Sequence, residues 1–354
     1  MAKLNRRQML IAGLVAGAAT SVTVNYLRDR MAEDTSEGKA DLGFEEETPL
    51  ERLLEVRDSV TLTPPEVPYD RALSSFFVRC CRLGTEQYLK AEQSLQDALQ
   101  YDGAISQLES YTEEFEAYRQ VASFKAEREP GFLEKQIKKH VLKEMEVPEI
   151  RQVYYGFVLT SPQHHIVVFR GTQELDEWIA NLDASQEYYR IYDISPGRVH
   201  KGFNDIYQET LDEQVRAVVG SLDPNLPCYF TGHSLGGALA VLAAIDIAES
   251  FSDRRARLRA YTYGTPRVGD PIFAKYYSEL VPNTYRIVNI ADVTPTLPPT
   301  VLGKQVYLHV GQEWSFLNQT GDMSPNHQLA AYRAAIDRQI EQTDVTSYNN
   351  IATG

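Results

Sequence analysis

The stretch PCYFTGHSLGGALA, residues 227–240, restricts the possible folds more than any other part of the chain. A short apolar run ends at Gly232, an alanine-rich run begins after Gly237, and Ser234 stands between the glycines. A buried strand, a tight turn and a helix would produce this order, because glycine lets strand and helix backbones cross closely. The stretch therefore predicts a strand–turn–helix unit, with Ser234 either as a turn residue or as a nucleophile.

Strands and helices alternate along the rest of the chain after Arg151. Two short β-branched and aromatic runs, VYYGFVLT and HHIVVFRG, are separated by the turn-like residues 161–163. Such alternation predicts an α/β domain over residues 148–345, with a mostly parallel sheet covered by helices on both faces. The remaining expected strands are PCYFTG, LRAYTYG, TYRIVNI and QVYLHV, and the expected helices are KGFNDIYQETLDEQVRAVVGSL, SLGGALAVLAAIDIAESF, DPIFAKYYSEL and HQLAAYRAAIDRQIEQ.

Residues 69–147 have the apolar spacing of helices. Large apolar residues recur at intervals of three, four and their sums, with Glu and Gln between them. We expect an N-terminal helical extension that packs on the α/β domain, and a partner-binding helical hairpin is the alternative. The residues that carry the spacing are Leu95, Leu99, Leu108, Phe115, Tyr118 and Val121.

The first 30 residues resemble an export signal. Arg6 and Arg7 precede 20 uncharged positions, 8–27, in the manner of a twin-arginine signal, and Ala16-Gly17-Ala18 is a candidate cleavage site. The same run could instead be an uncleaved membrane anchor, and a cytoplasmic protein with an apolar tail is the third alternative. Residues 31–68 are expected to be an acidic flexible linker, because Met31–Asp58 holds ten acidic and three basic residues.

Charge and cysteine content exclude several classes of function. The net charge of −14 makes nucleic acid an improbable partner. No zinc-type Cys/His spacing and no phosphate-binding glycine loop is present, so we expect neither a metal nor an organic cofactor. The three cysteines (Cys80, Cys81, Cys228) are expected to be inert buried thiols, since no histidine motif accompanies them as it would a catalytic cysteine.

Gly232-His233-Ser234-Leu235-Gly236 fits the G-x-S-x-G pattern of a serine nucleophile on a strand-to-helix turn. A serine nucleophile needs a base, and the base needs a group that orients it. On a sheet of this kind the chain order is serine, acid, histidine. Only His309 and His327 follow Ser234, and we prefer His327 because a loop beyond a strand can bring an imidazole over the serine.

Asp292 is the preferred acid, because it directly follows the strand RIVNIA at the end where sheet enzymes place their chemistry. Asp246 and Asp253 belong to the helix after the serine, Asp270 is expected to cap a helix, and Asp322 shares a loop with His327. The oxyanion of an acyl-transfer intermediate needs two backbone donors. We expect these from Leu235 and from Thr172, the latter directly after the strand HHIVVF.

These blocks together resemble the class 3, or fungal-type, lipases of the α/β-hydrolase superfamily. The resemblance implies the α/β-hydrolase fold, a triad of Ser234, Asp292 and His327, oxyanion donors Thr172 and Leu235, and a lid after Thr172. It places His200 near the site but outside the triad. The matching blocks, which cover about half the chain, are IVVFRGTQELDEWIANLD, VHKGFNDIY, FTGHSLGGALA, YTYGTPRVGD, RIVNIADVTPTLPP and NHQLAAYRAAI.

The resemblance implies a serine hydrolase that cleaves carboxylic esters of lipids, as triacylglycerol lipases do, at a membrane or lipid surface. Phospholipids, galactolipids or soluble aryl and feruloyl esters are alternative substrates of the same mechanism. A catalytically inactive lipase-like binding protein is the alternative from another class. The three cysteines depart from the disulfide framework of the secreted fungal members, and the oligomeric state stays open.

The segment QELDEWIANLD, residues 173–183, begins one residue past Thr172. As a helix it would place Trp178, Ile179 and Leu182 on one apolar face. We expect a lid that covers the site in water and turns this face toward lipid, since a lipid surface stabilises exposed apolar area. In the alternative, Trp178 packs permanently in the core.

Overall fold

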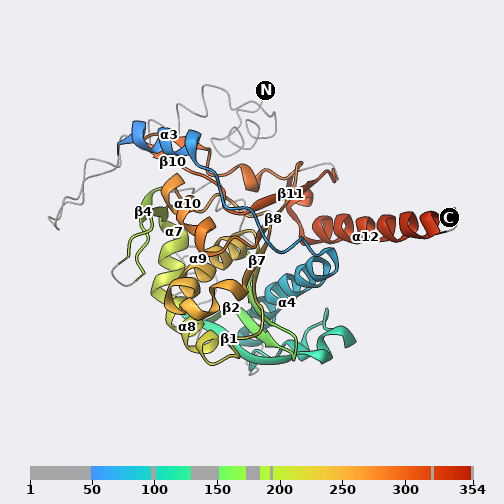
Figure 1. Ribbon diagram of the computed structural model, residues 1–354. Helices are drawn as coiled ribbons and strands as arrows, with labels where there is room; N and C mark the ends of the chain where they lie inside the picture. Colours follow the sequence, from blue (N-terminus) through green and yellow to red (C-terminus); the bar gives the residue numbers. More distant parts are fainter. Residues whose placement is uncertain are drawn as a thin grey trace, which may run out of the picture.

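A seven-stranded sheet forms the centre of the protein, in the spatial order β1-β2-β3-β6-β7-β8-β11 (Figure 1). The first three strands pair antiparallel and the remaining neighbours pair parallel. The computed structural model describes residues 49–96, 101–128, 151–172, 184–191, 194–319 and 323–351. The strands are β1 (Arg119–Arg128), β2 (Arg151–Thr160), β3 (His165–Phe169), β6 (Cys228–His233), β7 (Leu258–Tyr263), β8 (Thr284–Asn289) and β11 (Gln312–Phe316).

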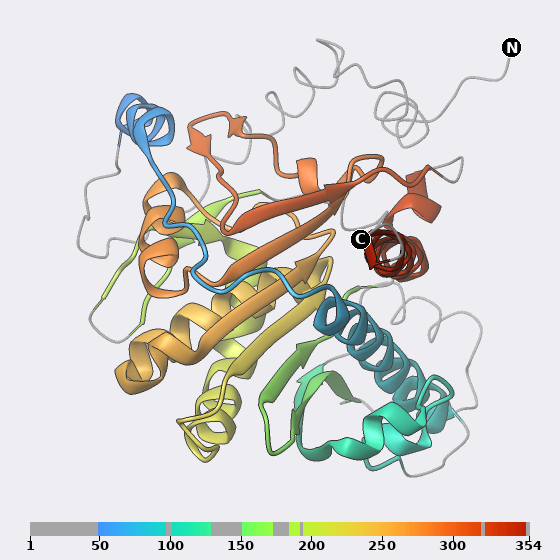
Figure 2. The ribbon, with the colours of Figure 1, turned by 45° about the vertical axis from the view of Figure 1, so that its right-hand side comes forward.

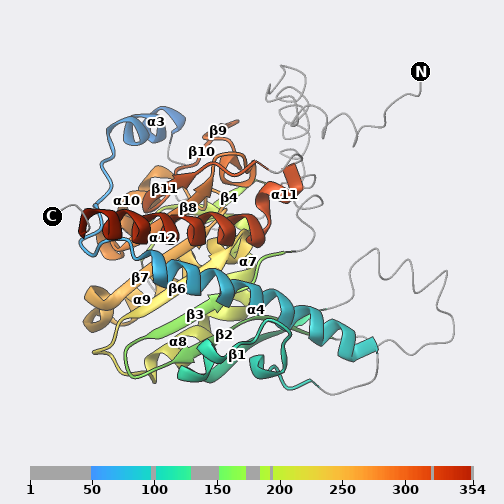
Figure 3. The same cartoon turned by 90° about the vertical axis from the view of Figure 1, so that its right-hand side faces the viewer.

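Helices cover both faces of the sheet, as the alternation predicts. One face carries α7 (Lys201–Ile206), α8 (Asp212–Gly220), α9 (Leu235–Ser250) and α10 (Pro271–Leu280). The other carries α4 (Arg71–Gln96) and α12 (Leu329–Ile351), which lie beside each other in Figures 2 and 3. The prediction of an α/β architecture is therefore confirmed.

The elements outside these two layers are short. They comprise α3 (Leu50–Ser59), the 3₁₀ turns η2 (Ile105–Gln107), η3 (Glu113–Ala117), η5 (Ser252–Arg257) and η6 (Thr294–Thr296), the π-helical turn η4 (Tyr207–Leu211), α11 (Met323–His327), and the two-stranded pairs β4 (Gln186–Tyr188) with β5 (Arg198–His200) and β9 (Val301–Leu302) with β10 (Gln305–Val306).

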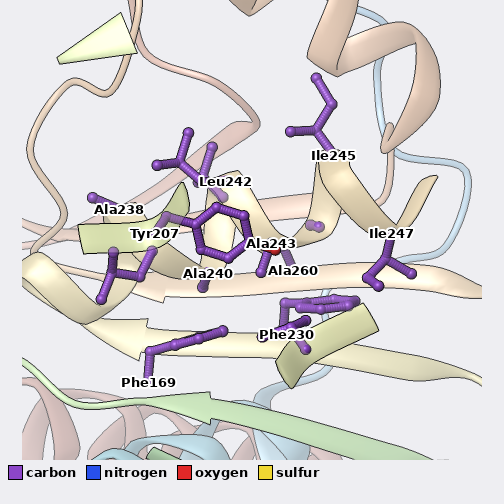
Figure 4. Close-up of a cluster of buried hydrophobic side chains, with 14 of the residues drawn as sticks. Phe169, Tyr207, Phe230, Ala238, Ala240, Leu242, Ala243, Ile245, Ile247 and Ala260 are labelled. Carbon is purple, nitrogen blue, oxygen red and sulfur yellow. The ribbon is translucent and has the colours of Figure 1, made fainter. Parts of the chain in front are cut away.

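Helix α9 is the central element of one hydrophobic core. Fourteen of its residues are buried, because Ala and Gly leave room on every side for strands and neighbouring helices. Ala240 and Leu242 lie in this cluster with Phe169 and Phe230 of the sheet and Tyr207 of η4 (Figure 4). A helix apolar all round fits only between layers, and this burial holds the start of α9 in place directly after Ser234.

The second core lies between the sheet and α4 with α12. Phe77 and Leu83 of α4 are fully buried against the sheet, together with Tyr332 of α12. Cys80, Cys81 and Cys228 are buried free thiols. Burial raises the pKa of Cys81 and of Cys228 to about 12, so these thiols stay protonated, as expected for inert cysteines.

Of the predicted flexible linker, 31–68, residues 31–48 lie outside the described residues, and the prediction is wrong for the rest. Residues 50–59 form α3, whose Leu53 is buried, and the chain that follows is hydrogen-bonded to the sheet domain. Glu66 and Val67 both donate their backbone N–H to Oδ1 of Asn283, at 3.0 and 2.8 Å. The acidic composition concealed this structure because a single buried leucine and a few backbone hydrogen bonds suffice to fix a short segment.

Within the segment predicted as helical, 69–147, the structure has the helix α4. The prediction is wrong for residues 101–128, which hold the 3₁₀ turns η2 and η3 and then β1 at the sheet edge, and residues 129–147 lie outside the described residues. This strand is antiparallel to β2, with register shifts between Gln120 and Ala122 and between Phe124 and Lys125. Such irregularities break the period-two alternation that identifies a strand in sequence. The apolar spacing therefore resembled that of a helix.

Two further expectations concern elements in the second half of the α/β domain. The expected strand QVYLHV is reduced to β10, and the last strand of the sheet is β11, parallel to β8. By contrast, Asp270 does cap α10, where its carboxylate accepts the backbone N–H of Phe273 at 2.7 Å.

The predicted export signal, residues 1–30, lies outside the described residues. In the part of the chain that the structure describes, no helix is both long and apolar enough to cross a membrane.

Candidate active site

Ser234 occupies the sharp turn between β6 and α9 and is almost completely buried. Its φ of 57° and ψ of −127° make it the one residue other than glycine with a positive φ in the described ranges. Glycines make this turn possible: a Cβ on Gly232 would collide with the backbone of Gly236, and a Cβ on Gly236 with the carbonyl of Phe169. Such strained backbone is expected where a side chain must be held in one orientation toward a substrate.

Asp292 and His327 form a buried pair. Asp292 lies three residues beyond β8, and its Oδ2 accepts the Nδ1–H of His327 at 2.7 Å. Its other oxygen accepts the backbone N–H of Thr294 at 2.9 Å, which fixes the carboxylate plane. The structure thus joins the preferred acid to the preferred base. The bond at Nδ1 turns Nε2 of the imidazole away from the carboxylate, as a proton acceptor for a serine requires.

The alternative acids and base that the structure describes lie elsewhere. Asp246 is bonded to Tyr207 and Arg216 inside the α7–α9 layer. His309 interacts through Nε2 with the carbonyl oxygen of Pro295 at 2.7 Å. Asp253 belongs to the exposed turn η5, Asp270 caps α10, and Asp322 lies outside the described residues. His200 stacks on Phe203 with ring centroids 4.2 Å apart, on the β4–β5 ribbon.

Tyr332 was missed by sequence reasoning. Its hydroxyl donates to the same Oδ2 of Asp292 at 2.6 Å and accepts the backbone N–H of Asn289 at 3.3 Å. Burial and the charge of Asp292 raise the pKa of Tyr332 well above its usual value, so the hydroxyl remains a donor. The only sequence signal was a tyrosine in the apolar helix after His327, which equally suits a core residue.

His233 and Gly264 complete the surroundings of His327. The half-buried His233 ring lies 4.4 Å from the His327 ring, and its Nε2–H donates to the His327 backbone carbonyl at 2.7 Å. Burial, followed by the neighbouring imidazole, lowers the pKa of His233 well below its usual value, so it stays neutral. Gly264 has a φ of 55°, and a Cβ there would approach Asp292 Oδ2 to 2.9 Å. Only glycine leaves room for the buried pair at this position.

Two chain segments that border Ser234 carry the residues expected to supply backbone donors. Leu235 is the first residue of α9, where backbone N–H groups have no acceptor within the helix. The chain at Gly171 passes Ser234 on the other side, since a Cβ on Gly171 would lie 3.5 Å from that of Ser234. Thr172 follows directly, at the carboxyl end of β3. The residues predicted for the lid, Trp178, Ile179 and Leu182, lie outside the described residues.

A cavity of about 550 Å³ opens beside His327, Thr172 and His233. This volume is in the range of small-molecule sites. Nε2 of His327 is buried and has no hydrogen-bond partner among the described residues, so the bond to Ser234 is not formed in this structure. Hydrogen bonds of catalytic groups are often completed only when substrate is bound. Among the described residues, no group of three His, Cys, Asp or Glu side chains could hold a metal ion.

Comparison with known proteins agrees with this geometry. A family model described as "Lipase (class 3)" matches residues 166–302, which include Ser234 and Asp292. Residues 166–302, less than half of this chain, are thus similar to the class 3 lipases. The lipase of Rhizomucor miehei is 40% identical over 153 residues, which cover 42% of this chain and 40% of that protein. The phospholipase A1 EG1 of Oryza sativa subsp. indica is 30% identical over 200 residues, 47% of this chain and 46% of that protein.

Solved structures extend the similarity beyond the matched residues. The superposition on the triacylglyceride lipase of Rhizomucor miehei covers 75% of this chain and 94% of that chain, with a TM-score of 0.50 at 23% identity. A second triacylglycerol lipase, described as having a serine protease triad as its catalytic centre, covers 72% of this chain and 81% of its own, with a TM-score of 0.50 at 26% identity. The fold is therefore the α/β-hydrolase fold. The chain spans less than half the length of the two relatives matched by sequence.

Proposed function

We propose that this chain is a serine hydrolase that cleaves carboxylic esters of lipids through Ser234, Asp292 and His327. The observation that carries the proposal is the hydrogen-bonded Asp292–His327 pair beside the strained serine turn, with His327 lining a cavity of substrate size. An acyl-transfer site needs these three groups in this order along a sheet of this kind.

In the first half of the proposed reaction, Ser234 transfers its hydroxyl proton to Nε2 of His327 while its Oγ bonds to the ester carbonyl carbon. Asp292 holds the ring through Nδ1 and stabilises the imidazolium that forms. The negative charge on the carbonyl oxygen is stabilised by the backbone N–H groups of Thr172 and Leu235. The carbon–oxygen bond to the alcohol then breaks, and His327 returns the proton to the leaving oxygen.

In the second half, water replaces the alcohol. His327 accepts a proton from the water as its oxygen bonds to the acyl carbon of the acyl-enzyme. The bond to Ser234 breaks, the serine regains its proton, and the carboxylic acid leaves. The sum of both halves is ester and water giving alcohol and acid, with every proton carried by one imidazole. This cycle uses only groups that border the described site.

The named relatives support lipid esters as the substrate class. Among these relatives, the names lipase and triacylglycerol lipase favour a neutral glyceride as the substrate of this chain. Phospholipase A1 supports a second candidate, a glycerophospholipid, and the charged side chains of the cavity favour that candidate. Soluble aryl or feruloyl esters would use the same groups. A lipase-like binding protein without activity is the alternative from another class.

Two parts of the proposal rest on sequence. Residues 173–183, with Trp178, Ile179 and Leu182 on one face, would form the cover of the site. Residues 1–30, with Arg6 and Arg7, would export the protein through a twin-arginine route or hold it at a membrane. The cover and a membrane anchor would each bring the site to a lipid surface.

A fluorophosphonate probe tests the proposal, because it reacts only with an activated serine. We expect the wild-type protein to be labelled and to hydrolyse p-nitrophenyl butyrate. Ser234→Ala should abolish labelling and lower the hydrolysis rate by about 10⁴- to 10⁶-fold with the fold intact. Ser221→Ala is the matched control, since Ser221 lies on the exposed end of α8. A folded wild-type protein that is neither labelled nor active would support the binding protein instead.

A further inference from the structure

The cavity beside His327 is bordered by an unusual number of arginines for a chain with a net charge of −14. Arg79 and Arg82 of α4 and Arg333 of α12 line it, whereas Glu114 is the one carboxylate among the lining residues. These helices lie on the same face of the sheet, beside each other (Figure 3). The positive wall is therefore built by segments outside residues 166–302, the part that matches the lipase family.

Arg82 presents its positive charge to the cavity although it has an acidic partner. Its Nε donates to Glu86 Oε1 at 2.7 Å, and Glu86 also accepts the backbone N–H and hydroxyl of Ser110, at 2.9 and 2.6 Å. The Glu86 side chain is 10% exposed and that of Arg82 is 56% exposed. Because Glu86 is buried and already accepts several hydrogen bonds, the exposed end of this ion pair is the guanidinium.

Arg333 has a similar arrangement on α12. Its Nε lies 3.4 Å from Asp337 Oδ2, and the Asp337 side chain is less exposed than that of Arg333. Among the described residues, the terminal nitrogens of Arg82 and Arg333 have no hydrogen-bond partner. Arg79, by contrast, donates hydrogen bonds to Glu114 and Ser75, so its guanidinium is already occupied. Two guanidinium groups in one cavity thus keep their terminal donors for a ligand.

From this arrangement we infer a subsite for an anionic head group, carried by the alcohol part of the ester, on Arg82 and Arg333. The inference rests on the proposed ester hydrolysis at Ser234. A guanidinium binds phosphoryl, sulfonyl and carboxyl oxygens through paired N–H donors. The cavity holds the head group while the ester reaches Ser234 past His327 and Thr172. The polar lining of Thr85, Ser110 and the arginines suits a charged head group better than an acyl chain.

Three monomeric substrates with the same acyl chains test the subsite: dihexanoyl phosphatidylglycerol, dihexanoyl phosphatidylcholine and dihexanoylglycerol. Monomers separate recognition in the cavity from attraction of the protein to a charged vesicle. We expect the wild-type kcat/KM to be at least about tenfold higher for phosphatidylglycerol than for dihexanoylglycerol, because a hydrogen bond to a charged group corresponds to roughly tenfold or more. Phosphatidylcholine should lie between them.

Arg82→Gln and Arg333→Gln should each lower the ratio of kcat/KM for phosphatidylglycerol to kcat/KM for dihexanoylglycerol several-fold. The double variant should bring this ratio close to one. Arg338→Gln is the matched control: Arg338 lies on the same helix outside the cavity and bonds to the backbone carbonyl of Ala334. It should keep the wild-type ratio. Arg82 and Arg333 are both exposed on helices, so we expect these variants to fold, and thermal unfolding of each variant checks this. The ratio within the wild-type protein alone remains decisive if a variant does not fold.

The outcomes separate this inference from the proposed function. A wild-type protein with no labelling and no hydrolysis removes the ester hydrolase itself. A wild-type protein that is labelled and active but shows equal kcat/KM for the three substrates overturns the subsite and leaves the hydrolase standing. An anionic preference that survives in the double variant also overturns it. Inorganic phosphate gives the last arm: equal inhibition on all three substrates, relieved in the double variant, would assign the arginines to a free anion instead of a head group.

Discussion

At the scale of single residues, the candidate site depends on how Asp292 is held. Its Oδ2 accepts two hydrogen bonds, from His327 at 2.7 Å and from Tyr332 at 2.6 Å. A carboxylate with two donors on one oxygen has a single orientation, and it shares its negative charge between the imidazole and the phenol. Tyr332 is therefore a positioning residue that acts through Asp292.

Replacing Tyr332 with phenylalanine removes one donor and retains the ring. We expect the free energy of unfolding to fall by about 2 kcal/mol, as for a lost hydrogen bond to a charged group. The carboxylate would then stabilise a protonated imidazole more strongly. The acidic limb of the pH–rate profile for p-nitrophenyl butyrate should accordingly move to higher pH.

The control for this variant is Tyr276→Phe, because Tyr276 lies on α10 and its hydroxyl donates to Glu249, away from Asp292. It should change stability without moving the profile. An unmoved acidic limb in Tyr332→Phe would mean that the tyrosine is only a packing residue.

At the scale of elements, helix α10 begins at a carboxylate that caps the helix and is also buried. Asp270 accepts the backbone N–H of Phe273 at 2.7 Å, and its side chain is almost inaccessible to water. Burial raises the pKa of Asp270 to about 6, against the opposing effect of the backbone hydrogen bonds. The folded protein therefore binds this proton more tightly than the unfolded chain, whose value is 3.8. Ionisation of Asp270 destabilises the fold as pH rises from about 4 to about 6.

The variant Asp270→Asn keeps an oxygen for the cap and cannot ionise. Between about pH 5 and pH 8 its free energy of unfolding should rise relative to wild type by about 1 kcal/mol, as the linkage relation gives for this pKa difference. Urea unfolding at both pH values measures the change. Asp253→Asn, at an exposed turn, should follow the wild-type response. Parallel responses of Asp270→Asn and wild type would contradict the predicted burial of charge.

At the scale of the whole molecule, the N-terminal arm and the candidate site lie at opposite ends of the sheet. The arm, residues 60–70, crosses the amino ends of β7 and β8, where Asn283 accepts two of its backbone N–H groups and Tyr261 accepts a third, from Asp70, at 3.0 Å. Ser234 and Asp292 follow the carboxyl ends of β6 and β8. The arm thus connects α3 and α4 to the sheet without entering the site.

This separation predicts that Asn283→Ala loosens the arm and spares catalysis. Two partly buried backbone N–H groups would lose their acceptor, and a hydrogen bond contributes about 0.5–1.5 kcal/mol to stability. Amide hydrogen exchange at Glu66 and Val67 should accelerate, while kcat/KM for p-nitrophenyl butyrate stays near wild type. Asn225→Ala, in an exposed turn, serves as the control. Unchanged protection at both amides would show that other contacts hold the arm.

The sequence by itself determined the features that depend on near neighbours in the chain. The turn at Ser234 requires only a strand, glycines and a helix within 14 residues, and the cap at Asp270 requires only the first turn of α10. The alternation of elements after Arg151 likewise specified the layered α/β class. Asp292 and His327 could be selected because chain order and the ends of strands restrict where an acid and a base can stand.

Only the tertiary structure decided what depends on contacts between distant segments. The edge strands β1 and β11 exist because β2 and β8 offer backbone partners, which local periodicity does not record. Tyr332 meets Asp292 across 40 residues of chain, and Arg82 of α4 meets Arg333 of α12 in one cavity only because both helices pack on the same face of the sheet. Sequence patterns report the preferences of neighbours in the chain, whereas these positions follow from how the layers pack.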